Sequence, residues 1–236
     1  MYIRKILVIV VLLGAVAMGL GMWHIYRMAF VPNTSFENNE AHVYIPTGAN
    51  LEDVAEIMEP LLKDVSTFKN TADQKKYSGN VKPGHYILTK GMTNNDIISV
   101  LRSSNIPVQV KFNNQERLED LARHISTQIE ADSTLLIQAM KDPEFLKEVG
   151  LNEDTALLLY VPNTYEFYWN SSAQTFRERM KKEFDHFWNE ERKQKAEKLN
   201  LTPEQVMNLA SIVQKETAMV DERPRVAGVY LYRLRI

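Results

Sequence analysis

The first part of the chain is an apolar run that limits the fold more than any other feature. No residue between Ile6 and Tyr26 is charged. An α-helix needs about 20 such residues to cross the hydrocarbon core of a bilayer. Because Arg4 and Lys5 precede the run, we expect the short N-terminus on the cytoplasmic side. The sequence therefore predicts that residues 1–26 form a cytoplasmic tip and a single-pass transmembrane anchor, with the bulk of the chain on the extracytoplasmic, periplasmic side.

A cleaved signal peptide is the alternative to an anchor. Ala15, Val16 and Ala17 have the small-x-small pattern that signal peptidase requires. The apolar run nevertheless continues past Ala17 to Trp23, which is longer than the apolar core of a typical signal peptide. This length favours an uncleaved anchor.

The composition is that of an ordinary globular protein. Apolar residues make up 44% of the chain and charged residues 25%, which excludes wholesale disorder. Lysine and arginine number 28 against 30 acidic residues, whereas a nucleic-acid binder normally carries a basic excess. We therefore expect no nucleic acid among its partners. The chain has no cysteine and its five histidines lack ligand spacing, so neither a metal site nor a cofactor is expected.

A small α+β module is predicted after the anchor. Residues 27–41 contain a proline and three asparagines with little periodicity, which indicates a linker. Residues 42–112 then alternate strand, helix, strand, helix and strand. The predicted strands are His42–Pro46, His85–Thr89 and Pro107–Phe112. Asn50 is placed to cap the first helix, and Thr93 or Asn94 the second.

The region from residue 113 to 236 is predicted to be mainly helical, because apolar residues recur in it at helical spacing. Residues 172–198 carry many charges of both signs, which indicates one long helix with a solvated face. Another helix is predicted to start at Thr202, which forms a capping box with Gln205 around Pro203 at the first helical position. The fold class expected for the whole chain is α+β.

One carboxyl falls on the apolar face of that last helix. Leu209 and Val213 belong to a stripe that must turn toward the core, and Glu216 lies seven residues after Leu209. A carboxyl held against apolar groups is pushed toward its neutral form, as a general acid requires. The alternative is structural, since Glu216 near a helix C-terminus can pair with Arg223 or Arg225. Helical spacing alone leaves both interpretations open.

Two stretches near the end of the chain form a recognisable motif, Leu209–Ala218 (LASIVQKETA) and Val226–Ile236 (VAGVYLYRLRI). Together they are similar to the catalytic signature of the YceG-like family, the MltG-type endolytic murein transglycosylases. Val161–Tyr165 (VPNTY) resembles its FPDTY motif. Ile45–Ala49 and Lys82–Thr93 resemble its LysM-like module. The resemblance implies a LysM-like module over residues 42–112 and a YceG-like catalytic domain over residues 113–236.

The resemblance also implies site residues. Glu216 stands at the position of the catalytic glutamate. Asn163, Tyr165 and Tyr168 are expected to bind substrate. The rings of the two tyrosines can stack on sugar faces. Burial in the core is the alternative for at least one of the rings at Tyr165, Phe167 and Tyr168.

Three departures from the family pattern qualify these assignments. Asn163 replaces the usual aspartate, and Leu157 and Leu158 replace a Glu-Gly pair that often precedes the motif. Both changes argue against a charged catalytic partner in this segment. Family members also continue for about another hundred residues past the RLRI stretch. We therefore expect the chain to be C-terminally truncated and its catalytic domain incomplete.

The activity implied by the resemblance is lytic cleavage of the MurNAc-GlcNAc bonds of nascent peptidoglycan, which leaves 1,6-anhydro-MurNAc ends. Ordinary glycosidases need two carboxyl groups. Here the C6 hydroxyl of the sugar is the tethered nucleophile, so Glu216 can serve first as general acid and then as base. The expected location is the bacterial cytoplasmic membrane, with peptidoglycan glycan strands and cell-wall synthesis proteins as partners. The alternative function is a non-catalytic, membrane-anchored cell-wall-binding or scaffold protein.

Overall fold

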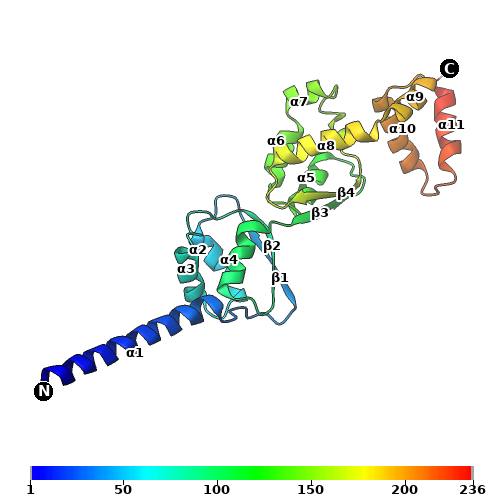
Figure 1. The fold of residues 1–236 in the computed structure, drawn as a ribbon. Coiled ribbons are helices and arrows are strands. Elements are labelled where there is room, and N and C mark those ends of the chain that lie inside the picture. Colours follow the sequence, from blue (N-terminus) through cyan, green and yellow to red (C-terminus); the bar gives the residue numbers. More distant parts are fainter. Residues whose placement is uncertain (1, 235–236) are drawn as a thin grey trace. The chain divides into compact units, whose positions relative to one another are not determined.

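The computed structural model describes residues 2–234, which form a mixed α+β fold with more helix than strand (Figure 1). Arg235 and Ile236, the end of the stretch that resembles the family signature, lie outside the described residues. The chain divides into two compact units. The first contains residues up to Val108 together with Glu166–Asn170, and the second contains Gln109–Tyr165 and the residues from Ser171 onward.

The first unit begins with helix α1, Tyr2–Phe30, and the predicted anchor lies within it. Large apolar side chains such as Leu12, Leu20 and Trp23 are exposed along this helix. Among the described residues, Val10–Phe30 is one helical segment long and apolar enough to span a bilayer, although an N-terminal signal sequence passes the same test. The helix is therefore a candidate membrane span.

The rest of the first unit packs helices on one face of a two-stranded sheet. Strand β1, Glu40–Ile45, pairs antiparallel with β2, Gly84–Thr89, so that Val43 lies opposite Tyr86. The helical segments are α2 (Leu51–Met58), the 3-10 turn η1 (Glu59–Leu61), α3 (Val65–Gln74) and α4 (Asn94–Ser103). Sheet and helices share one buried core, which includes Val43, Ile45, Val54, Phe68, Leu88, Ile97 and Leu101.

Local hydrogen bonds explain why two of these helices start where the sequence predicts. The Asn50 side chain accepts hydrogen bonds from the backbone N–H groups of Glu52 and Asp53, at 2.7 and 3.2 Å. The Asp53 carboxylate returns a contact of 2.8 Å to the N–H of Asn50. Thr93 and Asp96 form the same reciprocal box at α4. These caps satisfy N–H groups that a helix start otherwise leaves unpaired. Helix α3 was not predicted.

The segment expected as a linker, residues 27–41, is instead packed against this unit. Asn33 is 5% exposed, and its side-chain oxygen accepts a hydrogen bond from the backbone N–H of Asp64 at 2.9 Å. Its side-chain nitrogen donates to the side-chain oxygen of Asn94 at 2.7 Å. The nitrogen of Asn94 donates in turn to the backbone oxygen of Met28 at 2.6 Å. The buried amides therefore join the last turn of α1 to α3 and α4.

The last predicted strand forms but has a different partner. Strand β3, Pro107–Phe112, does not join β1 and β2 and pairs instead with β4, Asn163–Tyr168. No strand was predicted at β4. The N-terminal segment of the first unit runs to Val108, within β3, and the module boundary at Phe112 stays a prediction.

The second unit is mainly helical, as predicted. Its elements are α5 (Leu118–Ser126), α6 (Ser133–Met140), α7 (Pro143–Glu148), the 3-10 turn η2 (Ala156–Leu159), α8 (Ala173–Phe187), α9 (Glu190–Lys198), α10 (Pro203–Glu216) and α11 (Arg223–Arg233). The prediction of one helix over residues 172–198 was wrong. Trp188 is 5% exposed and ends α8, and the Asn189 side chain caps α9 by accepting from the backbone N–H of Arg192 at 3.0 Å.

Replacing Asn94 by alanine tests the buried amide network. The variant leaves one Asn33 donor without a partner and leaves the Met28 oxygen with the longer hydrogen bond from the Thr71 hydroxyl, at 3.4 Å. We expect it to lower the free energy of unfolding by about 1–3 kcal/mol. Asn95→Ala is the matched control, because Asn95 is a half-buried neighbour on the same helix. Urea unfolding followed by circular dichroism measures both variants. Equal losses in the two would contradict a special role for Asn94.

Candidate active site

Helix α10 begins as the sequence predicts. The hydroxyl of Thr202 accepts from the backbone N–H of Gln205 at 3.2 Å, and the Gln205 side chain accepts from the N–H of Thr202 at 2.8 Å. Pro203 occupies the first helical position, where a missing N–H costs nothing. The capping box therefore fixes the start of the helix that carries Glu216.

The predicted apolar face of α10 is only partly buried. Within this helix Val213 is the buried residue, at 6% exposure. Val206 and Leu209 are half-buried, whereas Ala210 is exposed. In the described residues, α10 is in contact mainly with α9, η2 and α11, so a narrow part of the stripe is covered.

Glu216, the predicted catalytic residue, is the last residue of α10 and is exposed. The expectation that its carboxyl is held against apolar groups was therefore wrong. The structural alternative is also not met, because no ion pair joins Glu216 to Arg223 or Arg225 among the described residues. Instead the hydroxyl of Tyr230 on α11 donates to Oε1 of Glu216 at 2.8 Å. This hydrogen bond and the negative charge of Glu216 raise the pKa of Tyr230.

Glu216 lines a pocket with a volume of about 770 Å³. Four segments of the second unit line it: the end of β3 with the loop after it (residues 112–116), Leu121 of α5, residues 154–162 around η2, and α10. Polar groups on its wall are Asn113, Asn114, Gln115, Asn208, Ser211 and Gln214, and its carboxyl groups are Glu116, Asp154 and Glu216. Leu157 and Leu158, which replace the Glu-Gly pair of the family, give it an apolar side. The volume is in the range of small-molecule sites.

Two side-chain pairs join the loop after β3 to the last turn of α10. The amide of Asn114 donates to the side-chain oxygen of Gln214, and Lys215 forms an ion pair with Glu116. Gln214 and Lys215 directly precede Glu216 on α10. They are exposed, yet they connect the two walls of the pocket. The run of amides at Asn113, Asn114 and Gln115 is the signal in the sequence that could have indicated this wall.

The residues predicted to bind substrate do not line the pocket. Asn163 is exposed, and its side-chain oxygen accepts from the backbone N–H of Thr164 at 2.8 Å. Tyr165 is buried, with its ring 5.8 Å from that of Phe112 and its hydroxyl donating to the backbone oxygen of Val161 at 2.6 Å. Tyr165 is thus the core residue that the alternative allowed.

The other aromatic residues of this segment, and the carboxyl groups of Glu166 and Glu222, lie outside the pocket. Tyr168 is 54% exposed and belongs to the first unit, as does the exposed Glu166. Phe167 is buried at 5% exposure. Glu222 begins α11, and its carboxylate accepts from the hydroxyl of Thr217 at 2.8 Å. No group of three or more histidine and acidic residues able to hold a metal ion occurs in the part of the chain that the structure describes.

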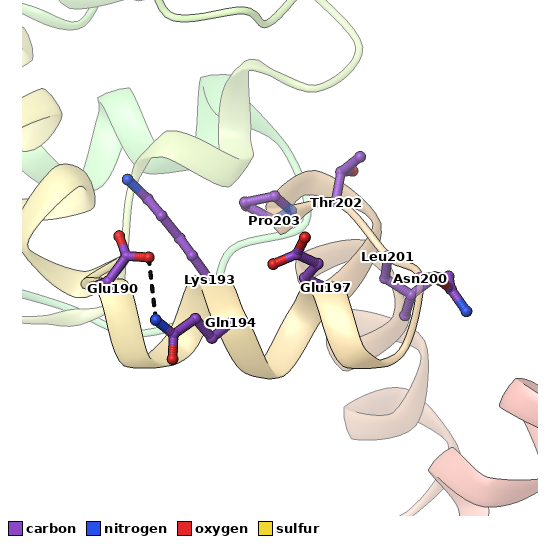
Figure 2. A pocket seen from close by; sticks show the side chains of 8 residues that line it. All are labelled: Glu190, Lys193, Gln194, Glu197, Asn200, Leu201, Thr202 and Pro203. Carbon is purple, nitrogen blue, oxygen red and sulfur yellow. Dashed lines mark hydrogen bonds between the residues drawn. The ribbon is translucent and has the colours of Figure 1, made fainter.

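A second hollow lies between α9 and the start of α10, with a volume of about 460 Å³ (Figure 2). Charged and amide side chains of α9 line one side, and Gln194 donates to Glu190 there at 3.4 Å. Thr202 and Pro203 lie at its other side. It contains none of the predicted site residues, so the pocket beside Glu216 is the better candidate.

The fold and site define a mixed α+β protein with an exposed carboxyl at an amide-lined pocket. The sequence model of the YceG-like family matches residues 43–236, which is most of the chain. The chain belongs to the YceG-like family, and the resemblance seen in its motifs is confirmed.

Two curated relatives from Streptococcus pneumoniae, strains D39 and R6, are named endolytic murein transglycosylases. Each is 27% identical to this chain, over 221 and 224 residues, which is 81% of this chain. The chain spans 40% of the length of these relatives. A crystal structure of a YceG-like protein from Listeria monocytogenes is 22% identical, with a TM-score of 0.47, covering 79% of this chain and 67% of that one.

The pairing of Lys215 with Glu116 is testable by titration. The hydrogen bond from Lys215, helped by its positive charge, lowers the pKa of Glu116. Any stability that the pair contributes is therefore fully present at pH values above the ordinary pKa of a glutamate. It is lost as the pH falls through the lowered pKa of Glu116 in the folded protein. We expect Lys215→Met to return the pKa of Glu116 to its ordinary range, as measured by NMR of the side-chain carboxyl carbons.

Glu119 provides the internal control for this titration. Its carboxylate pairs with Lys141 at 2.8 Å, and its pKa is lowered mainly by that hydrogen bond. Lys215→Met should leave Glu119 unchanged, while Lys141→Met should raise the pKa of Glu119 alone. An unchanged pKa of Glu116 in the Lys215→Met protein would show that Lys215 does not pair with Glu116.

Proposed function

We propose that this chain is a membrane-anchored endolytic murein transglycosylase in which Glu216 is the acid and base of the reaction. The observation that carries the proposal is the place of Glu216, exposed at the end of α10 and lining the 770 Å³ pocket. Membership of the YceG-like family and the names of the pneumococcal relatives support murein as the substrate.

The chemistry needs one carboxyl. Protonated Glu216 gives its proton to the glycosidic oxygen as the bond from that oxygen to C1 of MurNAc breaks. The C6 hydroxyl of the same MurNAc then forms a bond to C1 and loses its proton to the Glu216 carboxylate. The products are a 1,6-anhydro-MurNAc end and a free 4-hydroxyl on GlcNAc, and Glu216 is protonated again. Because the nucleophile is tethered to the reacting sugar, its correct placement replaces a second carboxyl.

The polar wall of the pocket suits a glycan. The side chains of Asn113, Asn114 and Gln115 offer both donors and acceptors, which sugar hydroxyls and acetamido groups can use. Leu157 and Leu158 provide apolar surface for the faces of sugar rings. This wall replaces Asn163, Tyr165 and Tyr168 as the proposed substrate-binding surface.

The first unit is proposed to hold the site at the outer face of the cytoplasmic membrane. Helix α1 is the anchor in this proposal, with Arg4 and Lys5 on the cytoplasmic side. The sheet and helices that follow it are proposed to be LysM-like and to bind glycan chains weakly or to act as a spacer.

Exchange of Glu216 for glutamine tests the catalytic assignment. In the full-length protein, the variant keeps the shape of the side chain and removes the transferable proton, so we expect formation of anhydro ends to fall at least about 100-fold with the thermal melt unchanged. The assay separates muropeptides released from intact glycan strands. Glu204→Gln, on the first turn of the same helix, is the control and should remain active.

Three results would count against this assignment. An active, folded Glu216→Gln protein would move the search to Glu166 or Glu222. A protein in which neither wild type nor variant releases anhydro ends, but which binds glycan strands, would support the alternative of a non-catalytic cell-wall-binding protein. Release of ordinary reducing ends would indicate hydrolysis by a second carboxyl.

The membrane orientation has its own test. In spheroplasts, a protease added from outside should digest the chain after Arg27, because the basic flank is expected to stay in the cytoplasm. A cytoplasmic protein is followed in the same sample to show that the membrane is intact. Protection of the region after Arg27 would overturn the orientation, and its release into the medium would indicate a cleaved signal peptide.

A further inference from the structure

The hydrogen bond between Tyr230 and Glu216 joins two helices at the reactive carboxyl. Helices α10 and α11 lie side by side and are joined by a short turn (Figure 1). The hydroxyl of Tyr230 lies 2.8 Å from Oε1 of Glu216. Tyr230 does not line the pocket that Glu216 lines. Its contact therefore reaches the carboxyl from outside the pocket.

The turn between the helices fixes the start of α11. The hydroxyl of Thr217 donates to Glu222 at 2.8 Å and accepts from the backbone N–H of Met219 at 3.0 Å. The backbone N–H of Glu222 donates to the oxygen of Met219 at 3.2 Å. These hydrogen bonds hold the closed turn that directly follows Glu216. The position of Tyr230, two turns into α11, follows from this closure because a helix is stiff over that length.

Nothing else in the described contacts restrains the Glu216 side chain. It is exposed, it ends its helix, and its recorded hydrogen bond is the one from Tyr230. A free glutamate side chain samples several rotamers, and ordering it costs conformational entropy. The guanidinium carbon of Arg233 lies 5.9 Å from the centre of the Tyr230 ring, at the outer limit of a cation–π contact.

We propose that Tyr230 is a positioning residue for Glu216: it holds Oε1 and so leaves Oε2 to exchange the proton with the substrate. The inference rests on the proposed function of Glu216. Oε1 accepts the Tyr230 hydrogen bond both when Oε2 carries the proton and when the group is ionised. The contact therefore persists through the acid step and the base step, and the carboxyl keeps one orientation throughout the cycle.

The first test is Tyr230→Phe, which removes the hydroxyl and keeps the ring. We expect kcat for the release of anhydro ends to fall about 10-fold, with KM unchanged within about twofold, because a misplaced carboxyl affects the transition state and not substrate binding. Tyr232→Phe is the matched control, since Tyr232 lies on the same helix and is 68% exposed. It should retain the wild-type kcat.

The second test measures the contact between Tyr230 and Glu216 by titration and does not depend on enzymatic activity. The carboxylate of Glu216 raises the pKa of Tyr230, so Glu216→Gln should lower the pKa of Tyr230 toward its ordinary value. NMR of ring-labelled tyrosines follows the titration, with Tyr230→Phe identifying the signal. An unchanged titration in the Glu216→Gln protein would overturn the inference because the two side chains would not be in contact.

The outcomes separate the two proposals. If Glu216→Gln abolishes activity while Tyr230→Phe keeps the wild-type kcat, Glu216 is catalytic and the positioning role is wrong. If Tyr230→Phe raises KM and leaves kcat unchanged, the tyrosine belongs to substrate binding and positioning is again wrong. If Glu216→Gln remains active, the proposed function fails and the positioning role fails with it, even where the titration demonstrates the contact.

Discussion

The orientation of α10 is the constraint on which the candidate site depends. The capping box of Thr202 and Gln205 fixes where the helix begins, and the buried Val213 fixes which way it faces. A helix advances about 100° per residue, so these two conditions determine the directions of the side chains after Val213. They place Lys215 toward the loop after β3 and end the helix at Glu216, where the chain turns into α11. A shift of one residue at Thr202 would rearrange every contact of the pocket wall.

The sequence predicted those elements whose cause is local. Asn50, Thr93 and Thr202 start helices through side-chain contacts within three residues, and such signals are visible in a short window. The pairing of β3 with β4 and the packing of Asn33 against Asn94 join residues far apart in the chain. No pattern in a short window of sequence predicts such contacts. The break between α8 and α9 was missed because mixed charge continues through it.

The site shows the same division. The motif selected Glu216 as the catalytic candidate, a role that stays a proposal. Its exposure was predicted wrongly because helical spacing defines a face and not the depth to which that face is covered. The pocket wall consists of polar pairs between distant segments, such as Asn114 with Gln214. Pairs of this exposed kind are individually weak. The shape of the pocket therefore depends on several of them acting together, which no single residue in the sequence reveals.

The amide of Asn94 bound to the backbone oxygen of Met28 has a mechanical consequence. A helix end normally leaves its last carbonyl groups unpaired, and here the folded unit itself supplies a partner. Met28 is also 6% exposed, and α1 contacts α3 and α4. The end of α1 is consequently held to α3 and α4 by buried contacts, without a flexible linker between them. In a bilayer that holds α1, a change in the tilt of this helix would rotate the rest of the first unit with it. Because helix tilt depends on the thickness of the bilayer, that thickness would determine the orientation of the first unit relative to the membrane.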